Sequence, residues 1–191
     1  DVTPEMLAVA GRLARERGVQ NVDFQEADVR ALPFADGTFH IVTCRTAAHH
    51  YPDLLGPVRE MARVLRPGGR LVVSDTVSPA DEVGDRFINA VEVLRDPTHV
   101  RDWTVAEWCQ ALRAAGLVVE AVQEMRLELD FPSWVERAGT PEELRSVLVA
   151  MLTRAPKRLR ELFEIRTAPL RFALHKAVFR AVRPEGSAQD P

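Results

Sequence analysis

The chain has few cysteines and no long apolar run. Its 191 residues contain two cysteines, Cys44 and Cys109, which are too few for a disulfide framework and lack the spacing of metal ligands. We therefore expect reduced thiols and a cytoplasmic protein. No apolar stretch approaches the roughly 20 residues that a transmembrane helix needs. Nothing resembles a secretory signal, so we expect no contact with a membrane.

An excess of basic residues is also missing. The formal net charge is -3, whereas proteins that bind nucleic acid usually carry a basic patch. No group of cysteines and histidines has the spacing of a zinc site, so the sequence predicts no metal. The composition, 46% hydrophobic and 28% charged, is ordinary for a globular protein, and the length is enough for one domain.

The first half of the chain alternates between two kinds of hydrophobic pattern. Helical spacing of apolar residues predicts helices at 3–17, with Thr3 as N-cap, and at 54–65. Short apolar runs predict buried strands at 22–27, 39–44 and 70–74. This alternation predicts an α/β fold with a mostly parallel sheet. Ligands bind beyond the carboxyl ends of the strands in such sheets.

The second half is predicted to contain helices at 81–94 and 104–115, an extended stretch at 117–130, a helical insertion at about 132–163 and a closing strand at 170–182. Capping boxes mark two of the helix starts, Thr104 with Glu107 and Thr140 with Glu143. We expect residues 1–183 to form a single, incomplete domain. The polar tail 184–191 is expected to be disordered.

Four stretches carry a resemblance to a known family: DVTPEML, EADVRALPFADGTFHIVTC, AAHHYPD and REMARVLRPGGRLVVSD, which lie between Asp1 and Asp75. In this order and spacing they resemble the class I S-adenosylmethionine-dependent methyltransferases, in particular the branch of the ubiquinone/menaquinone C-methyltransferases. The resemblance implies a Rossmann-like, three-layer methyltransferase fold with a helical insertion before the last strand. It also implies S-adenosylmethionine as cofactor and a small organic molecule as methyl acceptor.

The resemblance further implies a set of cofactor-binding residues: Asp1, Val2, Asp28, Val29, Cys44, Arg45 and Thr46. The Asp1 carboxylate would accept both ribose hydroxyls, and Asp28 would meet the adenine amino group. Residues 44–46 would approach the methionine part. Three of these residues have a plainer alternative: Asp1 as an acid that favours the start of a helix, Asp28 as a loop residue and Cys44 as a small buried side chain.

Three histidines are candidates for catalysis. His49 and His50 follow the strand at 39–44, and His99 lies between two predicted helices. Imidazole is the natural general base near neutral pH, although these side chains could instead position the substrate or satisfy a helix start. His40 and His175 are expected to be structural.

The glycine-rich loop that is diagnostic of the family is missing, and the resemblance places it upstream of Asp1 together with the first two strands. We therefore expect an N-terminally truncated domain, a fragment that does not bind the cofactor by itself. One alternative is a non-catalytic methyltransferase-fold module, a binding scaffold or a homodimer whose second copy fills the open sheet edges. Another is a nicotinamide-dependent dehydrogenase, against which stand LPFADGTFHIVTC and the lack of a Tyr-Lys pair.

Overall fold

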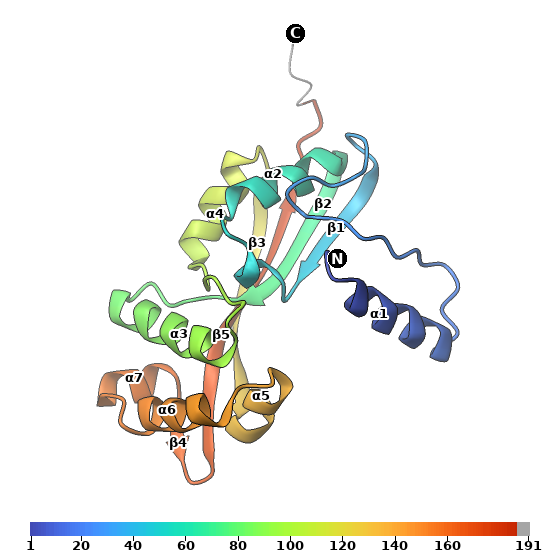
Figure 1. Ribbon diagram of the computed structural model, residues 1–191. Coiled ribbons are helices and arrows are strands. Elements are labelled where there is room, and N and C mark those ends of the chain that lie inside the picture. The colour runs from blue at the N-terminus through green and yellow to red at the C-terminus, as the bar shows by residue number, and fades with distance from the viewer. Residues whose placement is uncertain (187–191) are drawn as a thin grey trace.

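A computed structural model describes residues 1–186 and shows an α/β fold built on one mixed sheet (Figure 1). The strands are β1 (Phe39–Arg45), β2 (Leu65–Thr76), β3 (Val118–Asp130), β4 (Arg166–Thr167) and β5 (Leu170–Val182). Their order in the sheet is β1-β2-β5-β3, with β4 paired to β5. The pair β1–β2 is parallel, and β5 runs antiparallel to β2, β3 and β4. The expected α/β, Rossmann-like class is confirmed.

The helices are α1 (Pro4–Glu16), the 3-10 helix η1 (Ala48–His50), α2 (Leu55–Val64), α3 (Glu82–Arg95), α4 (Val105–Ala114), α5 (Phe131–Arg137), α6 (Glu142–Thr153) and α7 (Lys157–Leu162). The capping box of α4 is confirmed, because Thr104 accepts from the Glu107 N–H and the Glu107 carboxylate accepts from the Thr104 N–H. The box predicted for α6 is wrong. Pro141 takes its N-cap position, and the Thr140 hydroxyl donates instead to the Arg95 carbonyl at 2.8 Å.

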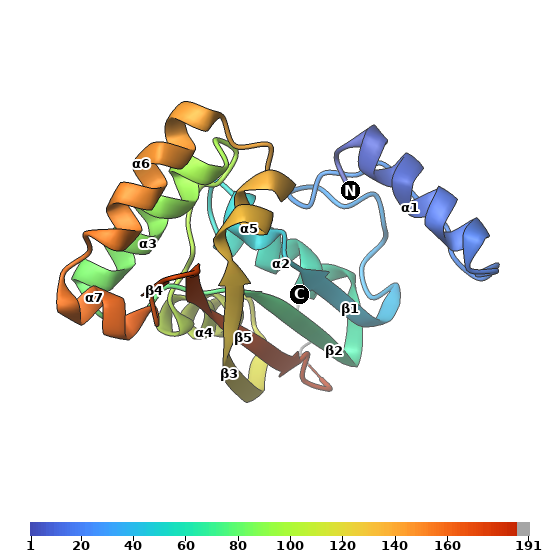
Figure 2. The same cartoon turned by 90° about the horizontal axis from the view of Figure 1, so that it is seen from below.

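The molecule has two hydrophobic cores, and each contains residues from a different part of β5 (Figures 1 and 2). Under α2 and α4, the fully buried Trp108 stacks on Phe179 with ring centroids 5.3 Å apart. Around α3 and α5–α7, Trp134 meets Phe172 edge-to-face at 4.8 Å. The predicted insertion at about 132–163 therefore forms a helical layer at one end of the two antiparallel strands.

The segment before β1 differs from the sequence-based expectation. Helix α1 forms as predicted, but it has no buried residue, and Met6 is 56% exposed, so its apolar face is not part of the core as helical spacing of apolar residues would lead one to expect. Residues 22–27, predicted as a strand, do not form one, and Phe24 is 46% exposed. The physical reason is that no described residue pairs with the free edge of β1, beyond which α1 lies apart from the sheet (Figures 1 and 2).

One face of the sheet also remains open within the described residues. Ile41, Arg70, Val182 and Val118 pair in register across the four main strands. In this row Ile41 is 62% and Val118 53% exposed. The described residues therefore supply two of the three expected layers. Of the predicted disordered tail, residues 184–186 end in a turn, and residues 187–191 lie outside the described residues.

Candidate functional site

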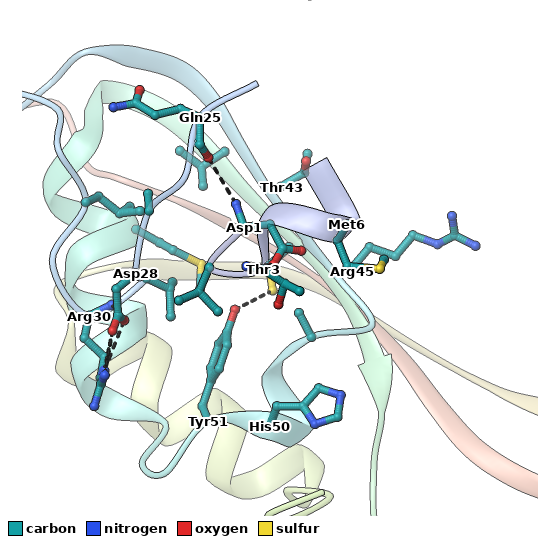
Figure 3. A pocket seen from close by; sticks show the side chains of 18 of the residues that line it. Asp1, Thr3, Met6, Gln25, Asp28, Arg30, Thr43, Arg45, His50 and Tyr51 are labelled. Atoms are coloured by element: carbon teal, nitrogen blue, oxygen red, sulfur yellow. Dashed lines mark hydrogen bonds and ion pairs between the residues drawn. The ribbon is translucent and has the colours of Figure 1, made fainter. Parts of the chain in front are cut away.

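A cleft with a volume of about 1090 Å³ opens at the carboxyl end of β1, on the side that faces α1 (Figure 3). It exceeds the roughly 300–1,000 Å³ typical of small-molecule sites. All of the cofactor-binding residues implied by the resemblance line it: Asp1, Val2, Asp28, Val29, Cys44, Arg45 and Thr46. Their convergence from separate segments fits a ligand of the size and mixed polarity of S-adenosylmethionine.

Asp1 lies just before α1, and one of its two carboxylate oxygens accepts a hydrogen bond. Its Oδ1 accepts from the Thr3 N–H at 2.9 Å, and its ammonium donates to the Gln25 carbonyl at 3.4 Å. Its Oδ2 makes no hydrogen bond with any residue in 1–186. The Thr3 side chain makes no capping bond, so the helix-start acceptor is Asp1. The same carboxylate can thus begin the helix and still offer one oxygen to a ribose hydroxyl.

Asp28 is already engaged by a cation. The Arg30 guanidinium donates to both of its carboxylate oxygens, and the Arg30 N–H donates to Oδ1 at 2.8 Å. These bonds lower the pKa of the Asp28 carboxyl to about 2. An adenine amino group at this carboxylate would therefore share its oxygens with Arg30.

The end of β1 carries a strained residue. Thr46 has a φ of 51°, in the left-handed region that non-glycine residues seldom adopt. Its N–H donates to the Ser74 carbonyl at 2.9 Å, which ties the turn to β2. Strain of this kind collects at ligand-binding and catalytic sites. Cys44 just before it is buried, and burial raises the pKa of its thiol, which agrees with the reading of Cys44 as a small packed side chain.

The turn after Thr46 places His49 on a buried carboxylate. His49 Nδ1 lies 2.8 Å from Asp75 Oδ1, and Asp75 Oδ2 accepts from the N–H groups of Ala47 and Ala48. Asp75 is only 1% exposed. Burial lowers the pKa of His49, but the hydrogen bond and the charge of Asp75 outweigh it, and the pKa stands above its usual value.

Asp75 was not among the site residues predicted from the sequence. Burial raises the pKa of its carboxyl, yet the bond from His49 and the two backbone N–H groups lower it below the usual value. It is therefore an ionised partner for the imidazole. Its signal in the sequence is an acid closing the run RLVVS, next to the strand that leads to His49.

The other two candidate histidines lie against His49. The ring centroids of His49 and His50 are 4.2 Å apart, and those of His49 and His99 are 5.7 Å apart in a stacked arrangement. His50 lines the cleft, and its Nδ1 lies 3.0 Å from the Thr98 carbonyl. His99 is buried, and this burial and the neighbouring His49 and His50 lower its pKa to about 4. All three predicted residues thus converge.

The remaining histidines are remote from this cluster, as expected. His40 Nε2 lies 2.8 Å from the Arg66 guanidinium, and His175 Nε2 lies 3.3 Å from the Leu162 carbonyl. Among residues 1–186, no group of three or more His, Cys, Asp or Glu side chains could hold a metal ion. No helix in the same range is long and apolar enough to cross a membrane.

Comparison with known proteins assigns the family. A family model described as a methyltransferase domain matches residues 1–73. YcgJ of Bacillus subtilis, an uncharacterized methyltransferase, is 38% identical over 187 residues, which cover 96% of this chain and 74% of YcgJ. The chain belongs to the class I S-adenosylmethionine-dependent methyltransferases. The dehydrogenase alternative is therefore wrong.

Solved structures agree with this methyltransferase assignment. The crystal structure of YcgJ superposes with a TM-score of 0.91 at 37% identity, over 97% of this chain and 81% of that one. A Bacillus halodurans protein assigned as a methyltransferase gives a TM-score of 0.93 at 32% identity, over 96% of this chain and 81% of that one.

The similarity to the quinone branch is shorter. The demethylmenaquinone methyltransferase of Thermus thermophilus is 47% identical over 79 residues, 41% of this chain and 36% of that enzyme. YcgJ therefore matches more of this chain, and the similarity to this quinone-branch enzyme covers less than half of it.

Proposed function

We propose that this methyltransferase transfers the methyl group of S-adenosylmethionine to a small organic acceptor that loses a proton, with His49 as the general base. The observation that carries the proposal is the His49–Asp75 pair, which lies beside the cleft that gathers the implied cofactor residues. Family membership supports the reaction class.

The hydrogen bonds of His49 support this role. Because Asp75 accepts the proton on Nδ1, the lone pair of the neutral ring lies on Nε2. Nε2 makes no hydrogen bond with a described residue. S-adenosylmethionine, when bound, supplies an electrophilic methyl carbon on a sulfonium sulfur. His49 Nε2 would take the acceptor's proton, the acceptor's electron pair would form the bond to the methyl carbon, and the sulfonium would leave as a neutral thioether.

His50 and Asp1 would act in binding. His50 lines the cleft with its Nδ1 directed to the Thr98 carbonyl, which leaves Nε2 for a ligand. Asp1 offers its free oxygen to the ribose. Alignment of acceptor, methyl carbon and sulfur supplies most of the rate enhancement in such a reaction, so positioning by the cleft matters as much as the base.

The test is methyl transfer in a full-length protein that contains this chain. Label from S-[methyl-³H]adenosylmethionine would be followed into a panel of phenols, hydroquinones, carboxylic acids and amines. We expect His49→Asn to lower kcat by about 100- to 10,000-fold, as the loss of a general base does. His40→Asn is the matched control, since among the described residues the His40 side chain bonds only Arg66, and it should leave kcat unchanged. An H49N variant that keeps kcat within about threefold would remove His49 from the chemistry.

We further propose that residues outside this chain complete the cofactor cleft. The free edge of β1, the exposed Ile41 and the unpacked α1 support this, as does the greater length of the relatives. Calorimetric titration of the present chain with S-adenosylhomocysteine should then show no binding at micromolar concentrations. Micromolar affinity would show that the described cleft is sufficient.

A second candidate remains as an outcome of these experiments: a non-catalytic scaffold, in which a second copy covers the open sheet face. The exposed row from Ile41 to Val118 favours it. Sedimentation analysis would reveal a dimer, and a dimer with no methyl transfer for any acceptor would support this function. We also propose a cytoplasmic location, which rests on the free thiols of Cys44 and Cys109.

A further inference from the structure

A chain of hydrogen bonds continues behind the His49–Asp75 pair. Asp75 Oδ1, which faces His49 Nδ1, also accepts from the Thr76 N–H at 2.9 Å. The Thr76 hydroxyl lies 2.5 Å from Asp102 Oδ1 and 3.4 Å from Asp75 Oδ1. A single hydroxyl thus stands between two carboxylates that are each 1% exposed. Since a hydroxyl has one proton, the shorter distance shows that the Thr76 hydroxyl donates to Asp102, while Asp75 Oδ1 keeps its contacts with His49 and the Thr76 N–H.

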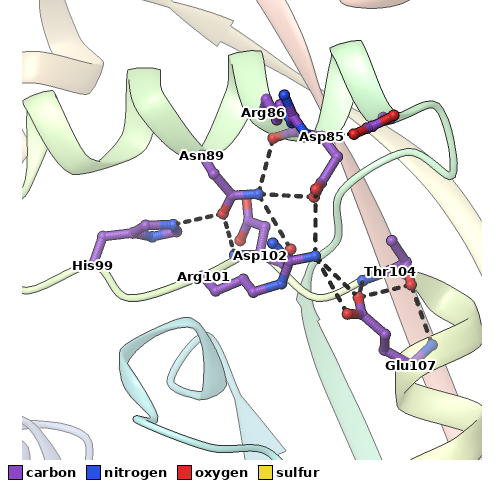
Figure 4. Close-up of polar contacts among 9 residues, drawn as sticks. Asp85, Arg86, Asn89, His99, Arg101, Asp102, Thr104 and Glu107 are labelled. Carbon is purple, nitrogen blue, oxygen red and sulfur yellow. Dashed lines mark hydrogen bonds and ion pairs between the residues drawn. The ribbon is translucent and has the colours of Figure 1, made fainter.

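Asp102 leads back to the histidine cluster by a second path (Figure 4). Its N–H donates to Asn89 Oδ1 at 2.7 Å, and the same oxygen lies 3.2 Å from His99 Nε2. His99 in turn stacks on His49. The contacts therefore run in a ring, from His49 through two carboxylates and an amide to the neighbouring imidazole.

The second carboxylate oxygen of Asp102, Oδ2, does not stabilise the fold. Asp102 Oδ2 is buried without a hydrogen-bond partner in the described part of the chain. Leaving a buried polar group unpaired costs about 1–3 kcal/mol, and more for a charge. Burial also raises the pKa of the Asp102 carboxyl, while the bond from Thr76 opposes this shift. A buried acid with an unpaired oxygen beside a reactive histidine fits a functional role better than a structural one.

We propose that Thr76 and Asp102 are positioning residues for methyl transfer, which direct the Thr76 hydroxyl away from Asp75 Oδ1 and hold a second carboxylate behind His49. The inference rests on the proposed role of His49. It adds that the basicity of this histidine depends on two residues that touch neither the ring nor the cleft.

The effect of removing Asp102 has a definite sign. With Asn at this position the second negative charge disappears, and the amide can donate to the Thr76 oxygen. The Thr76 hydroxyl is then free to turn and donate to Asp75 Oδ1, which draws charge from the oxygen that holds His49. Both changes destabilise the imidazolium, so the pKa of His49 should fall.

Several other groups also face His49 and must be held constant. Asp75 comes from β2, His50 from η1, Glu92 from α3 and His99 from the loop that also carries Asp102. The matched control is therefore a carboxylate of the same polar cluster that has no bond to Thr76. Asp85 meets this need, since its bonds go to Asn89 and Arg101 (Figure 4).

The primary measurement is the titration of the His49 imidazole by NMR in Asp102→Asn, Thr76→Val, Thr76→Ser and Asp85→Asn. We expect D102N to lower the His49 pKa by about 0.5–1 unit. T76S should retain the titration of the parent protein, because it keeps the hydroxyl, and D85N should move it by less than half of the D102N shift. T76V removes the hydroxyl without adding a donor to Asp75. It should therefore shift the pKa less than D102N and instead lower kcat on the order of tenfold, with KM for the cofactor unchanged.

The activity profile supplies a second readout in the full-length enzyme. The midpoint of the acidic limb of kcat against pH should follow the NMR shift of His49 in D102N. If D102N and T76V, both folded by circular dichroism, leave the His49 titration within 0.2 unit of the parent, the positioning role is overturned. If D102N fails to fold, T76V against T76S decides the question. If D102N shifts the His49 titration but leaves the dependence of kcat on pH unchanged, the hydrogen-bond network is upheld and His49 is not the base.

Discussion

Glu92 on α3 is a buried acid whose replacement should stabilise the protein. It is 5% exposed, and the nearest cation, Arg95 Nη1, lies 3.6 Å from its carboxylate. No described residue donates a hydrogen bond to that carboxylate. Burial, followed by the negative charge of Asp102, raises the pKa of Glu92 above its usual value. Near neutral pH the folded protein therefore holds a proton that the unfolded chain releases.

The sign of the pH dependence follows from this proton. Above the unfolded pKa of about 4.3 the unfolded state ionises while the folded state stays protonated, so stability falls as pH rises. Glu92→Gln replaces the acid with a neutral side chain of the same shape and removes this loss. From the cost of burying a poorly paired polar or charged group, we expect a gain of about 1–3 kcal/mol at pH 7.5. The gain should shrink as pH falls and be smallest at pH 4.5, where a large share of the unfolded carboxyls is also protonated.

Urea denaturation at pH 4.5, 6.0 and 7.5 measures this gain. Glu82→Gln on the same helix is the control, since the Glu82 side chain is 75% exposed and, within residues 1–186, pairs only with Arg86. It should change the unfolding free energy by less than about 0.5 kcal/mol at each pH. A loss of stability in E92Q at pH 7.5 would show that the ion pair with Arg95 outweighs the burial of the charge. A gain that is constant with pH would refute the reasoning from protonation.

Two further substitutions test the packing of the helices around the site. Gly84→Ala should destabilise by about 1–3 kcal/mol, because a Cβ there would lie 2.6 Å from Leu162 Cδ2 and 2.9 Å from Pro79 Cγ, and this overpacking exceeds the gain in helix propensity; a raised melting temperature would contradict it. Thr104→Ala removes the hydroxyl that accepts the Glu107 N–H and should cost about 1 kcal/mol in chemical denaturation, whereas Thr104→Ser should cost little, so equal losses would contradict the capping argument.

Local patterns predicted the elements whose stability is local. The apolar run at 39–44 became β1, the capping box became the start of α4, and the run closing at 182 became β5. The strand predicted at 70–74 lies within the longer β2, which begins at Leu65 and includes Pro67, Gly68 and Gly69. Pairing with β1 extends this strand to residues that the sequence pattern does not predict as strand.

The predictions that failed depend on a neighbouring element that the local sequence does not specify. Residues 22–27 have strand composition, but a strand exists only where another strand supplies hydrogen bonds, and sequence composition does not specify that neighbour. The amphipathic α1 likewise has an apolar face without a surface to bury it. In the site, the histidines could be singled out by type. Asp75 is 26 positions from His49, and only the adjacent parallel strands bring the two together.

Different contacts hold the His49 side and the cofactor side of the site, so the pKa of His49 and cofactor affinity should depend on different parts of the protein. The proton-accepting side, His49, Asp75 and Asp102, is fixed by hydrogen bonds that connect η1, β2, α3 and the loop after α3. On the cofactor side, the chain is anchored from Leu32 onward, where the Glu60 carboxylate accepts its N–H at 2.9 Å. Upstream of it, Asp1 is tied back mainly by its carbonyl accepting from the Ala27 N–H at 3.0 Å. Cofactor affinity should therefore depend on whatever packs against α1, whereas the His49 pKa should not. The titration of His49 can thus be measured in the present chain even where S-adenosylhomocysteine does not bind to it.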